Sequence, residues 1–364
     1  MSNSFFPSST ITWYMARMFL LRSFAVLFAL ALVLQTLDLL GESGNVLAHA
    51  GNGSPELWKY LFLRLPQIVA FLLPFSILLG TLITLATLNQ NSEVISMKAA
   101  GLSAHQVLAP LFVAAFGVAI LSFTFNDRIV SRASATLDRW QRADYGPIPI
   151  DPKSQSNVWV RDGDHLIHAG SVTGRGSETR LFDVTVYNRN GGSLLAIVRA
   201  PRAVPKAGGW TLIDANRFDV ARGIQTKLGN VTVAGGVRPD QFTLANVDAD
   251  GLSFRGLWKA IGDLREAGRP TSTLEAGLWH KLASPLSAIL MPLLGAVAAF
   301  GIARSGRLFV RAVIGMALGF AYFVADNFGL AMGNLGAYPP LLAAWGPFLL
   351  FLLIGEAVLI QTEE

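Results

Sequence analysis

Long apolar runs alternate with short polar segments in the first third and the last quarter of the chain. Stretches without Asp, Glu, Lys or Arg cover residues 23–37, 65–88, 104–125, 282–303, 312–325 and 327–355. A bilayer core about 30 Å thick needs roughly 20 helical residues to cross it. The pattern therefore predicts six transmembrane helices, near residues 13–40, 57–88, 104–126, 279–302, 308–331 and 341–360.

The middle of the chain, residues 127–270, has a different pattern, with short alternating runs separated by Gly, Asn and Asp. Alternation of apolar and polar residues is typical of half-buried strands. Turn signals at 162–164, 188–192 and 206–209 predict an antiparallel β domain, either a sandwich or a jelly roll. The predicted fold is thus an α-helical polytopic membrane protein with six transmembrane helices and an inserted all-β domain.

The chain divides accordingly into three parts. Residues 1–126 hold three membrane helices, residues 127–270 hold the β domain with its flanking helices, and residues 271–364 hold three more membrane helices. The first flanking helix is predicted over residues 127–143.

A second flanking helix is predicted within residues 251–270, which end in Gly268 and Pro270. Its apolar residues recur at helical spacing, and Trp258 and Lys259 suit the headgroup level of a bilayer. We expect a helix at the membrane surface, with packing on the β domain as the alternative. The apolar positions are Leu257, Ile261 and Leu264.

Basic residues in the short connections predict the orientation of the chain. The connections at 89–106 and 303–311 contain four Lys or Arg residues, whereas those at 41–56 and 331–340 contain none. Cytoplasmic connections carry the excess of basic residues. We therefore expect both ends of the chain in the cytoplasm and the β domain on the opposite, periplasmic side.

Composition narrows the classes of function. Hydrophobic residues make up 52% of the chain and charged residues 15%, and the net charge of +5 comes without a basic run interleaved with aromatics. No nucleic-acid partner is therefore expected. Cysteine is absent, and the five histidines do not follow a metal-binding spacing, so neither a metal site nor a cofactor is expected. No cleavable signal precedes the first apolar run, which should remain as an anchor.

No enzymatic motif is visible in the sequence. A G-x-x-x-x-G-K-[ST] phosphate loop and a G-x-S-x-G elbow are both missing. We therefore expect no catalytic residues in this chain, and a transporter built on it would need an ATPase partner. A membrane-embedded hydrolase would need a nucleophile or metal constellation that the sequence does not contain.

The connection "NQNSEVISMKAAGLS", residues 89–103, predicts a short capped helix over residues 92–101. Ser92 is a suitable N-cap residue. Glu93 lies at the positive end of the helix dipole and Lys98 near the negative end. This is a complete two-turn helix in a place where a plain turn would connect two membrane helices.

The end of this short helix is also marked. Gly101 can adopt the left-handed conformation that stops a helix, and Ser103 with Gln106 forms a capping box for the next one. The helix is too short to bury its own apolar residues, so either the lipid interface or a groove in a cytoplasmic partner should cover them. These residues are Val94, Ile95, Met97 and Leu102. A partner groove would suit the permease half of an ATP-driven machine.

Three stretches, residues 73–103, 279–301 and 319–351, resemble the LptF/LptG permeases of the lipopolysaccharide exporter. The third, with its acidic residue, its "GAYPP" connection and its proline-interrupted last span, is more similar to the LptG branch of that family than to the LptF branch. The resemblance covers the chain in the same order of three spans, β domain and three spans.

The resemblance implies a heterodimer with a second permease, a cytoplasmic ATPase dimer that binds the ATP, and a single-span subunit that belongs to a periplasmic bridge of β-jelly rolls. Lipopolysaccharide would be extracted from the outer leaflet of the inner membrane of a Gram-negative bacterium, between the first and fifth spans of the permeases. The short helix would dock in the ATPase. The implied coupling residues are Ser92, Glu93, Val94, Met97, Lys98 and Gly101.

Two arginines are candidates for contact with lipopolysaccharide. Arg139 and Arg142 are three residues apart and share a helix face. The resemblance places an R-x-x-R motif here, where guanidinium groups can bind lipid phosphates. A solvated helix face that pairs with Asp138 or Asp144 is the alternative.

Polar residues within the spans are further candidates. The first span carries Gln35 and Asp38 where the family often has lysine, which leaves the cationic clamp incomplete, and the missing charge would come from the partner permease. For Asp38, an interfacial carboxylate in water is the alternative. Asp326 is an ionisable residue inside the fifth span and hence a functional candidate, with simple hydration as the alternative. An ion-coupled secondary transporter of a lipid or amphiphile that uses Asp38, Asp326 or Glu356 is the alternative function. It predicts an inverted repeat, and the two halves share no evident pattern.

Overall fold

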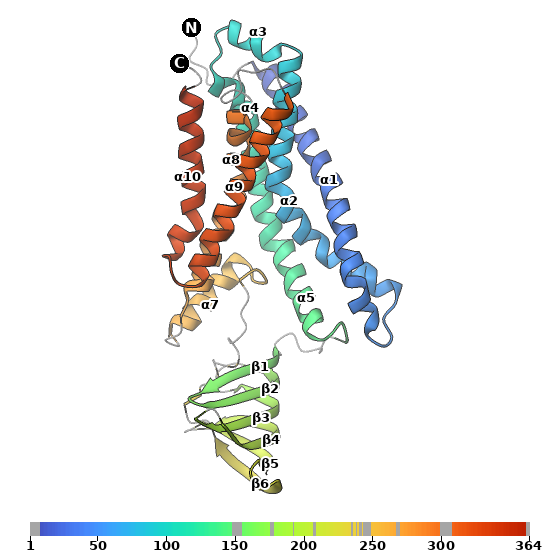
Figure 1. Ribbon diagram of the computed structural model, residues 1–364, viewed down its shortest axis with the longest axis vertical. Coiled ribbons are helices and arrows are strands. Elements are labelled where there is room, and N and C mark those ends of the chain that lie inside the picture. The colour runs from blue at the N-terminus through green and yellow to red at the C-terminus, as the bar shows by residue number, and fades with distance from the viewer. Residues whose placement is uncertain are drawn as a thin grey trace. The chain divides into compact units, whose positions relative to one another are not determined.

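The computed structural model of the chain divides into a helical unit and a β unit (Figure 1). The helical unit combines residues 1–145, 249–265 and 269–364, and the β unit combines residues 146–248 and 266–268. The structure describes residues 8–147, 155–174, 178–191, 193–206, 209–233, 236, 237, 239, 242, 249–266, 270–298 and 308–361.

Six long helices build most of the helical unit. They are α1 (Ser9–Ala48), α2 (Ser54–Gln90), α4 (Ala104–Phe125), α8 (Ser272–Ala296), α9 (Leu308–Asn334) and α10 (Pro340–Gln361). Five described stretches are long and apolar enough to cross a membrane, in α1, α2, α4 with its continuation, α9 and α10. Helices of this kind therefore account for five of the six predicted spans.

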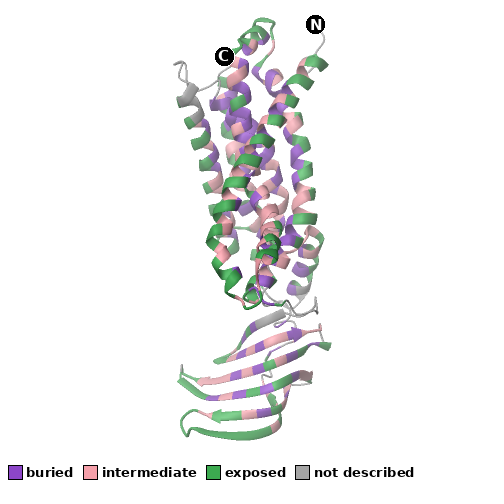
Figure 2. Cartoon of the chain, turned by 90° about the vertical axis from the view of Figure 1, so that its right-hand side faces the viewer, coloured by how far each residue is buried: buried purple, intermediate pink, exposed green. Residues whose placement is uncertain are grey.

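Helix α8 corresponds to the remaining predicted span, 279–302, whose last residues lie outside the described part of the chain. It is not among the stretches that pass the length and composition criteria. It packs against α2, α4, α9 and α10, and the residues from Leu290 to Ala296 are all buried. The uncharged run of residues 282–303 extends beyond the described end of this helix. Figure 2 shows the buried residues gathered inside the bundle.

Glycines allow the long helices to approach closely. A Cβ atom added at Gly80 of α2 would lie 2.1 Å from the Oγ of Ser23 in α1. One added at Gly333 of α9 would lie 2.6 Å from the Cβ of Ala343 in α10. Contacts between small residues are typical of helix packing in membranes.

The third span does not end where its apolar run ends. Helix α4 continues through a π-helical segment, η1 (Asn126–Val130), into α5 (Ser131–Arg142). The predicted helix over 127–143 is therefore a direct extension of the third span. Its buried residues Leu137 and Trp140 face the bundle, where α5 packs against α2.

The predicted second flanking helix is α7 (Phe254–Glu266), and its apolar positions Leu257, Ile261 and Leu264 are buried. Residues 249–265 belong to the helical unit. Packing of this helix on the β domain stays an alternative. A location at the membrane surface stays a prediction.

The β unit contains one six-stranded antiparallel sheet whose strands follow chain order (Figure 1). The strands are β1 (Gln155–Asp162), β2 (His165–Thr173), β3 (Arg180–Asn190), β4 (Ser193–Lys206), β5 (Gly209–Asp219) and β6 (Ile224–Val233). The inserted all-β domain and the predicted turn at 162–164 are confirmed, while the predicted turns at 188–192 and 206–209 include residues outside the described part of the chain. Among the described strands each joins the next as a neighbour, without the crossed connections of a Greek key.

One face of this sheet forms a core. Trp210 is 1% exposed, its ring centroid lies 5.0 Å from that of Phe242, and its Nε1 donates to the carbonyl oxygen of Val237 at 2.9 Å. Alternation of buried and exposed residues along β2 puts His165 and His168 on opposite faces, as the sequence predicts.

Candidate functional sites in the helical unit

The predicted short helix is α3 (Glu93–Ala99), between α2 and α4. The expected cap by Ser92 is wrong. Ser92 occupies the N-cap position, but its φ of 59° is left-handed and its side chain makes no capping hydrogen bond. An N-cap side chain reaches the helix from an extended backbone, whereas Ser92 reverses the chain at the end of α2 and contributes its carbonyl oxygen, which accepts from the N–H of Ser96 at 3.0 Å.

The predicted stop of α3 at Gly101 and the predicted capping box of α4 are confirmed. Gly101 has a φ of 86°, and its N–H donates to the carbonyl oxygen of Lys98 at 2.9 Å. The capping box of α4 is complete, because the N–H of Gln106 donates to the Oγ of Ser103 and the N–H of Ser103 donates to the Oε1 of Gln106. Both ends of the connection are thus fixed by local hydrogen bonds.

The cover of the apolar residues of α3 comes largely from the chain itself. Val94 and Met97 are 3% and 9% exposed and belong to the main core of the helical unit, and Leu102 packs against it. Ile95 is 65% exposed. Of these four residues, only Ile95 is thus left for lipid or a partner to cover.

Glu93 connects α3 to the first helix. Its Oε1 accepts from the Nδ2 of Asn91 at 3.1 Å and from the hydroxyl of Tyr14 at 3.4 Å. Tyr14 lies in the second turn of α1. Glu93 thus joins α3 to the start of α1.

The carboxylate of Asp38 has hydrogen-bond partners within the chain and is not surrounded by water alone. The Nε and Nη2 of Arg64 lie 3.2 and 3.0 Å from its Oδ1, and the hydroxyl of Tyr60 donates to its Oδ2 at 2.7 Å. Arg64 also donates to Gln67, which donates to the Oγ of Ser134 in α5 at 2.7 Å. This polar network joins α1, α2 and α5.

The cation beside Asp38 therefore lies in the chain itself, while the supply of a lipid-binding cation by the partner permease stays a prediction. The signal was present in the sequence. Tyr60, Arg64 and Gln67 have the spacing of one helix face and lie where the apolar run of α2 begins.

A second contact at the same end of α1 involves Glu42. The hydroxyl of Tyr145 donates to its Oε1 and accepts from the Nε2 of Gln141 at 3.2 Å. Burial, followed by the hydrogen bond to Glu42, raises the pKa of Tyr145 to about 12. The hydroxyl therefore stays protonated and remains a donor at neutral pH. Asn52 donates to the Tyr145 carbonyl oxygen at 2.9 Å, which fixes the backbone there.

Gln35 lies one turn before Asp38 on α1 and is 6% exposed. Neither its Nε2 nor its Oε1 has a hydrogen-bond partner in the described part of the structure. An unsatisfied buried amide is unfavourable by about 1–3 kcal/mol. A direct role in substrate binding stays a prediction for this residue.

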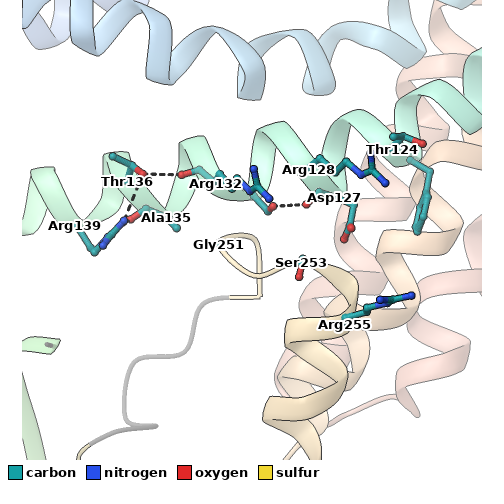
Figure 3. A pocket seen from close by; sticks show the side chains of 12 residues that line it. Thr124, Asp127, Arg128, Arg132, Ala135, Thr136, Arg139, Gly251, Ser253 and Arg255 are labelled. Atoms are coloured by element: carbon teal, nitrogen blue, oxygen red, sulfur yellow. Dashed lines mark hydrogen bonds between the residues drawn. The ribbon is translucent and has the colours of Figure 1, made fainter. Parts of the chain in front are cut away.

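Arg139 and Arg142 are both exposed on α5. Arg139 also lines a cavity, which Figure 3 shows from close by. The Nε of Arg139 donates to the carbonyl oxygen of Ala135 at 2.9 Å. The two arginines share a helix with Ser134 of the polar network, while contact with lipopolysaccharide stays a prediction.

Asp326 is paired across two helices. Its Oδ2 lies 3.0 Å from the Nε2 of His280 in α8, and its side chain is 15% exposed. Glu356 of α10 lies in the same way 3.1 Å from the Nε2 of His105 in α4. The sequence offered no role for either histidine, because residues so far apart in the chain leave no local pattern. The hydration expected as an alternative for Asp326 is replaced by this pairing.

The candidate residues thus lie in separate parts of the helical unit. Asp38 has its partners on α2, Asp326 has its partner on α8, and the short helix has its contacts at the start of α1. Among the described residues, no group of three or more His, Asp or Glu side chains could hold a metal ion.

Comparisons with known proteins agree with this architecture. The family model described as "Lipopolysaccharide export system permease LptF/LptG" matches residues 13–361. The "Lipopolysaccharide export system permease protein LptG" of Escherichia coli strain K12 is 27% identical over 326 residues, which cover 86% of this chain and 89% of that protein. The protein of the same name from Haemophilus influenzae is 26% identical over 313 residues, which cover 84% and 86%.

Proposed function

The chain belongs to the LptF/LptG family of lipopolysaccharide export permeases, and from this we propose that it couples ATP hydrolysis by a partner protein to the extraction of lipopolysaccharide. Family membership makes it an inner-membrane permease of the export system. The proposal adds the partners, namely a second permease, a cytoplasmic ATPase dimer and a single-span periplasmic subunit. In this proposal the chain binds no cofactor of its own.

The arrangement of α3 is the observation that carries the coupling role. Val94 and Met97 anchor the short helix in the core, Glu93 hydrogen-bonds to α1, and Ile95 is left exposed. In Figure 1, α3 lies at the same end of the bundle as the start of α1 and the end of α10. A partner that binds the exposed face of α3 could move α1 without touching the rest of the chain.

The surface of α1 supports a role in handling an amphiphile. Only 28% of its most apolar stretch is buried inside the chain, against 50% for α2. Phe24, Phe28 and Leu32 are among its exposed residues. Each methylene group removed from water contributes about 0.8 kcal/mol, so acyl chains that leave the membrane need such a surface. We propose that extraction takes place beside α1 and α9, with the β unit in the periplasm.

Reconstitution of the chain with a second permease and the ATPase tests the proposal. Lipopolysaccharide release should depend on both ATP and this subunit, and ATP-independent release would contradict it. Ile95→Glu should leave the fold intact, because the residue is exposed, and should weaken ATPase binding and release together. Leu335→Glu is the matched control, since Leu335 is 76% exposed in the α9–α10 connection. Equal effects of the two substitutions would exclude docking on α3.

The ion-coupled alternative gains one observation, the His280–Asp326 pair between α8 and α9. Such a pair inside a membrane could carry a proton. Lipopolysaccharide release driven by a proton gradient without nucleotide would favour that alternative. Release that continues unchanged in His280→Gln and requires ATP would exclude it.

A further inference from the structure

A cavity of about 780 Å³ lies between the third span and the start of α7 (Figure 3). One wall is the continuous helix from the end of α4 through η1 into α5, and the other is the segment from Gly251 to Arg255. Both walls belong to the helical unit. Protein pockets that bind small molecules typically measure about 300–1,000 Å³, so this cavity is large enough for a headgroup.

Four arginines line the cavity. Arg128, Arg132 and Arg139 come from η1 and α5, at spacings that repeat on one helix face, and Arg255 comes from α7. In Figure 3, Arg128 and Arg255 lie at one end of the cavity, Arg132 lies between, and Arg139 lies at the other end. Arginines from segments more than a hundred residues apart in sequence therefore face the same space.

Asp127 is the single acidic residue in the cavity lining, and its carboxylate already has a hydrogen-bond partner. Its Oδ1 accepts a hydrogen bond from the backbone N–H of Phe254. The rings of Phe123 and Phe254 also meet edge to face, with centroids 6.3 Å apart. These two contacts hold the start of α7 against the third span and so place Arg255 opposite Arg128.

The arginines have no neutralising partner within the residues that the structure describes. No ion pair joins Arg128, Arg132 or Arg255 to a carboxylate there. A solvated helix face would explain arginines on α5 alone. It does not explain Arg255, which is held opposite them by a hydrogen bond and a ring contact. Guanidinium groups stay charged at all relevant pH values, so an anion would relieve their repulsion.

We propose that this cavity binds the phosphate group of a membrane lipid through Arg128, Arg132 and Arg255. Guanidinium groups form paired hydrogen bonds with phosphate oxygens. The cavity begins where the uncharged run of residues 104–125 ends, and Phe123 gives it an apolar side, which suits a headgroup whose acyl chains stay beside α4. The exposed Trp258 on the next turn of α7 is typical of the headgroup level.

The inference goes beyond extraction and coupling, because it concerns lipid binding by the chain alone. It needs neither ATP nor a partner, so its failure would not affect the proposed function. Arg139 closes the far end of the cavity and is left out of the test, since it is already a candidate for contact with the transported lipid.

Native mass spectrometry of the full chain in detergent tests the inference. The probes are diphosphorylated lipid A, the same lipid A without phosphates, phosphatidylglycerol and inorganic phosphate. The wild type should bind each phosphate-bearing lipid at least roughly tenfold more tightly than dephosphorylated lipid A, the ratio expected when one charge-assisted hydrogen bond is gained. The variant with Arg128→Gln, Arg132→Gln and Arg255→Gln should lose this preference.

Arg17→Gln is the matched control, because Arg17 is exposed on α1 and does not line the cavity. It should keep the wild-type preference. Equal binding by the triple variant and the wild type would overturn the inference. Inorganic phosphate that displaces the lipid at equal concentration would overturn the assignment to a lipid.

If the triple variant does not fold, single variants at Arg255 provide the same test. Arg255→Gln removes the arginine that α7 contributes to the cavity, and Arg255→Lys keeps its charge but loses the paired geometry. We expect the preference for phosphate to fall in the order wild type, lysine variant, glutamine variant. Identical affinities in all three would overturn the inference, with circular dichroism confirming that each variant is folded.

Discussion

The two units of the molecule build their interiors by different rules. The β unit buries large and branched apolar residues such as Trp210 and Phe242 on one face of a sheet. The helical unit brings its helices together at Gly80 and Gly333 and ties them with polar pairs such as Asp38 with Arg64. Lipid is as apolar as leucine, so burial of apolar surface does not drive helices together in a membrane, and close fit and polar contacts take that role.

Removal of a large side chain from the sheet core should have the largest effect on stability. Trp210→Ala should lower the free energy of unfolding of the β unit by about 3–5 kcal/mol, because it leaves a cavity beside Phe242. Hydrogen exchange should show lost protection in β4 to β6 and unchanged protection in α2 and α4. Trp159→Ala, at a residue 48% exposed, is the control. Equal losses in the two variants would show that the sheet has no such core.

Addition of a side chain should instead disrupt the helical unit. Gly80→Leu should destabilise it by about 1–3 kcal/mol, the usual effect of overpacking, because the new side chain meets the backbone of Ser23. Gly117→Leu in α4 is the control, since a Cβ there has nothing within 4 Å. The midpoint of thermal unfolding in detergent should fall only for Gly80→Leu. A similar fall for both would mean that leucine itself, rather than the contact, is the cause.

Loss of one partner of the polar network should have a smaller effect. Arg64→Gln leaves Asp38 without its cation, and since the Arg64 side chain is 37% exposed, solvent should limit the loss to about 1 kcal/mol. A double-mutant cycle with Asp38→Asn measures the coupling directly. A coupling energy indistinguishable from zero would show that the bond between α1 and α2 contributes no stability.

The smallest effect should be a loss of stability that appears only above pH 10.0. The pKa of Tyr145 is raised from the usual 10.0 to about 12 in the folded chain, so folding favours the protonated hydroxyl. The stability from this group is fully present below pH 10.0 and is lost as the pH rises toward 12. The advantage of the wild type over Tyr145→Phe should therefore shrink across this window. An advantage that stays constant with pH would contradict the role of the hydroxyl.

Features that depend on neighbours in sequence could be predicted. The strands alternate, the turn at 188–192 has its glycines and asparagine, and Gly101 ends α3 with a positive φ. These depend on local periodicity and local backbone preference. Helix α8 was predicted for the same reason, from the uncharged run of residues 282–303.

Features that depend on distant segments could not be predicted. His280 meets Asp326, and α2 and α4 cover Val94 and Met97, only because the helices pack in one particular way. Ser92 failed as a cap because the turn after α2 requires a left-handed residue there. Sequence spacing alone does not reveal how helices pack or which residue must be left-handed.

That left-handed turn limits which amino acids position 92 can accept. A positive φ is uncommon for any residue except glycine, is tolerated by asparagine and aspartate, and is strongly disfavoured for β-branched side chains. A change to valine or isoleucine would therefore disturb the start of α3 without altering any residue within that helix. Mutational scans of this loop should thus find position 92 intolerant of β-branched residues, although its side chain makes no capping hydrogen bond.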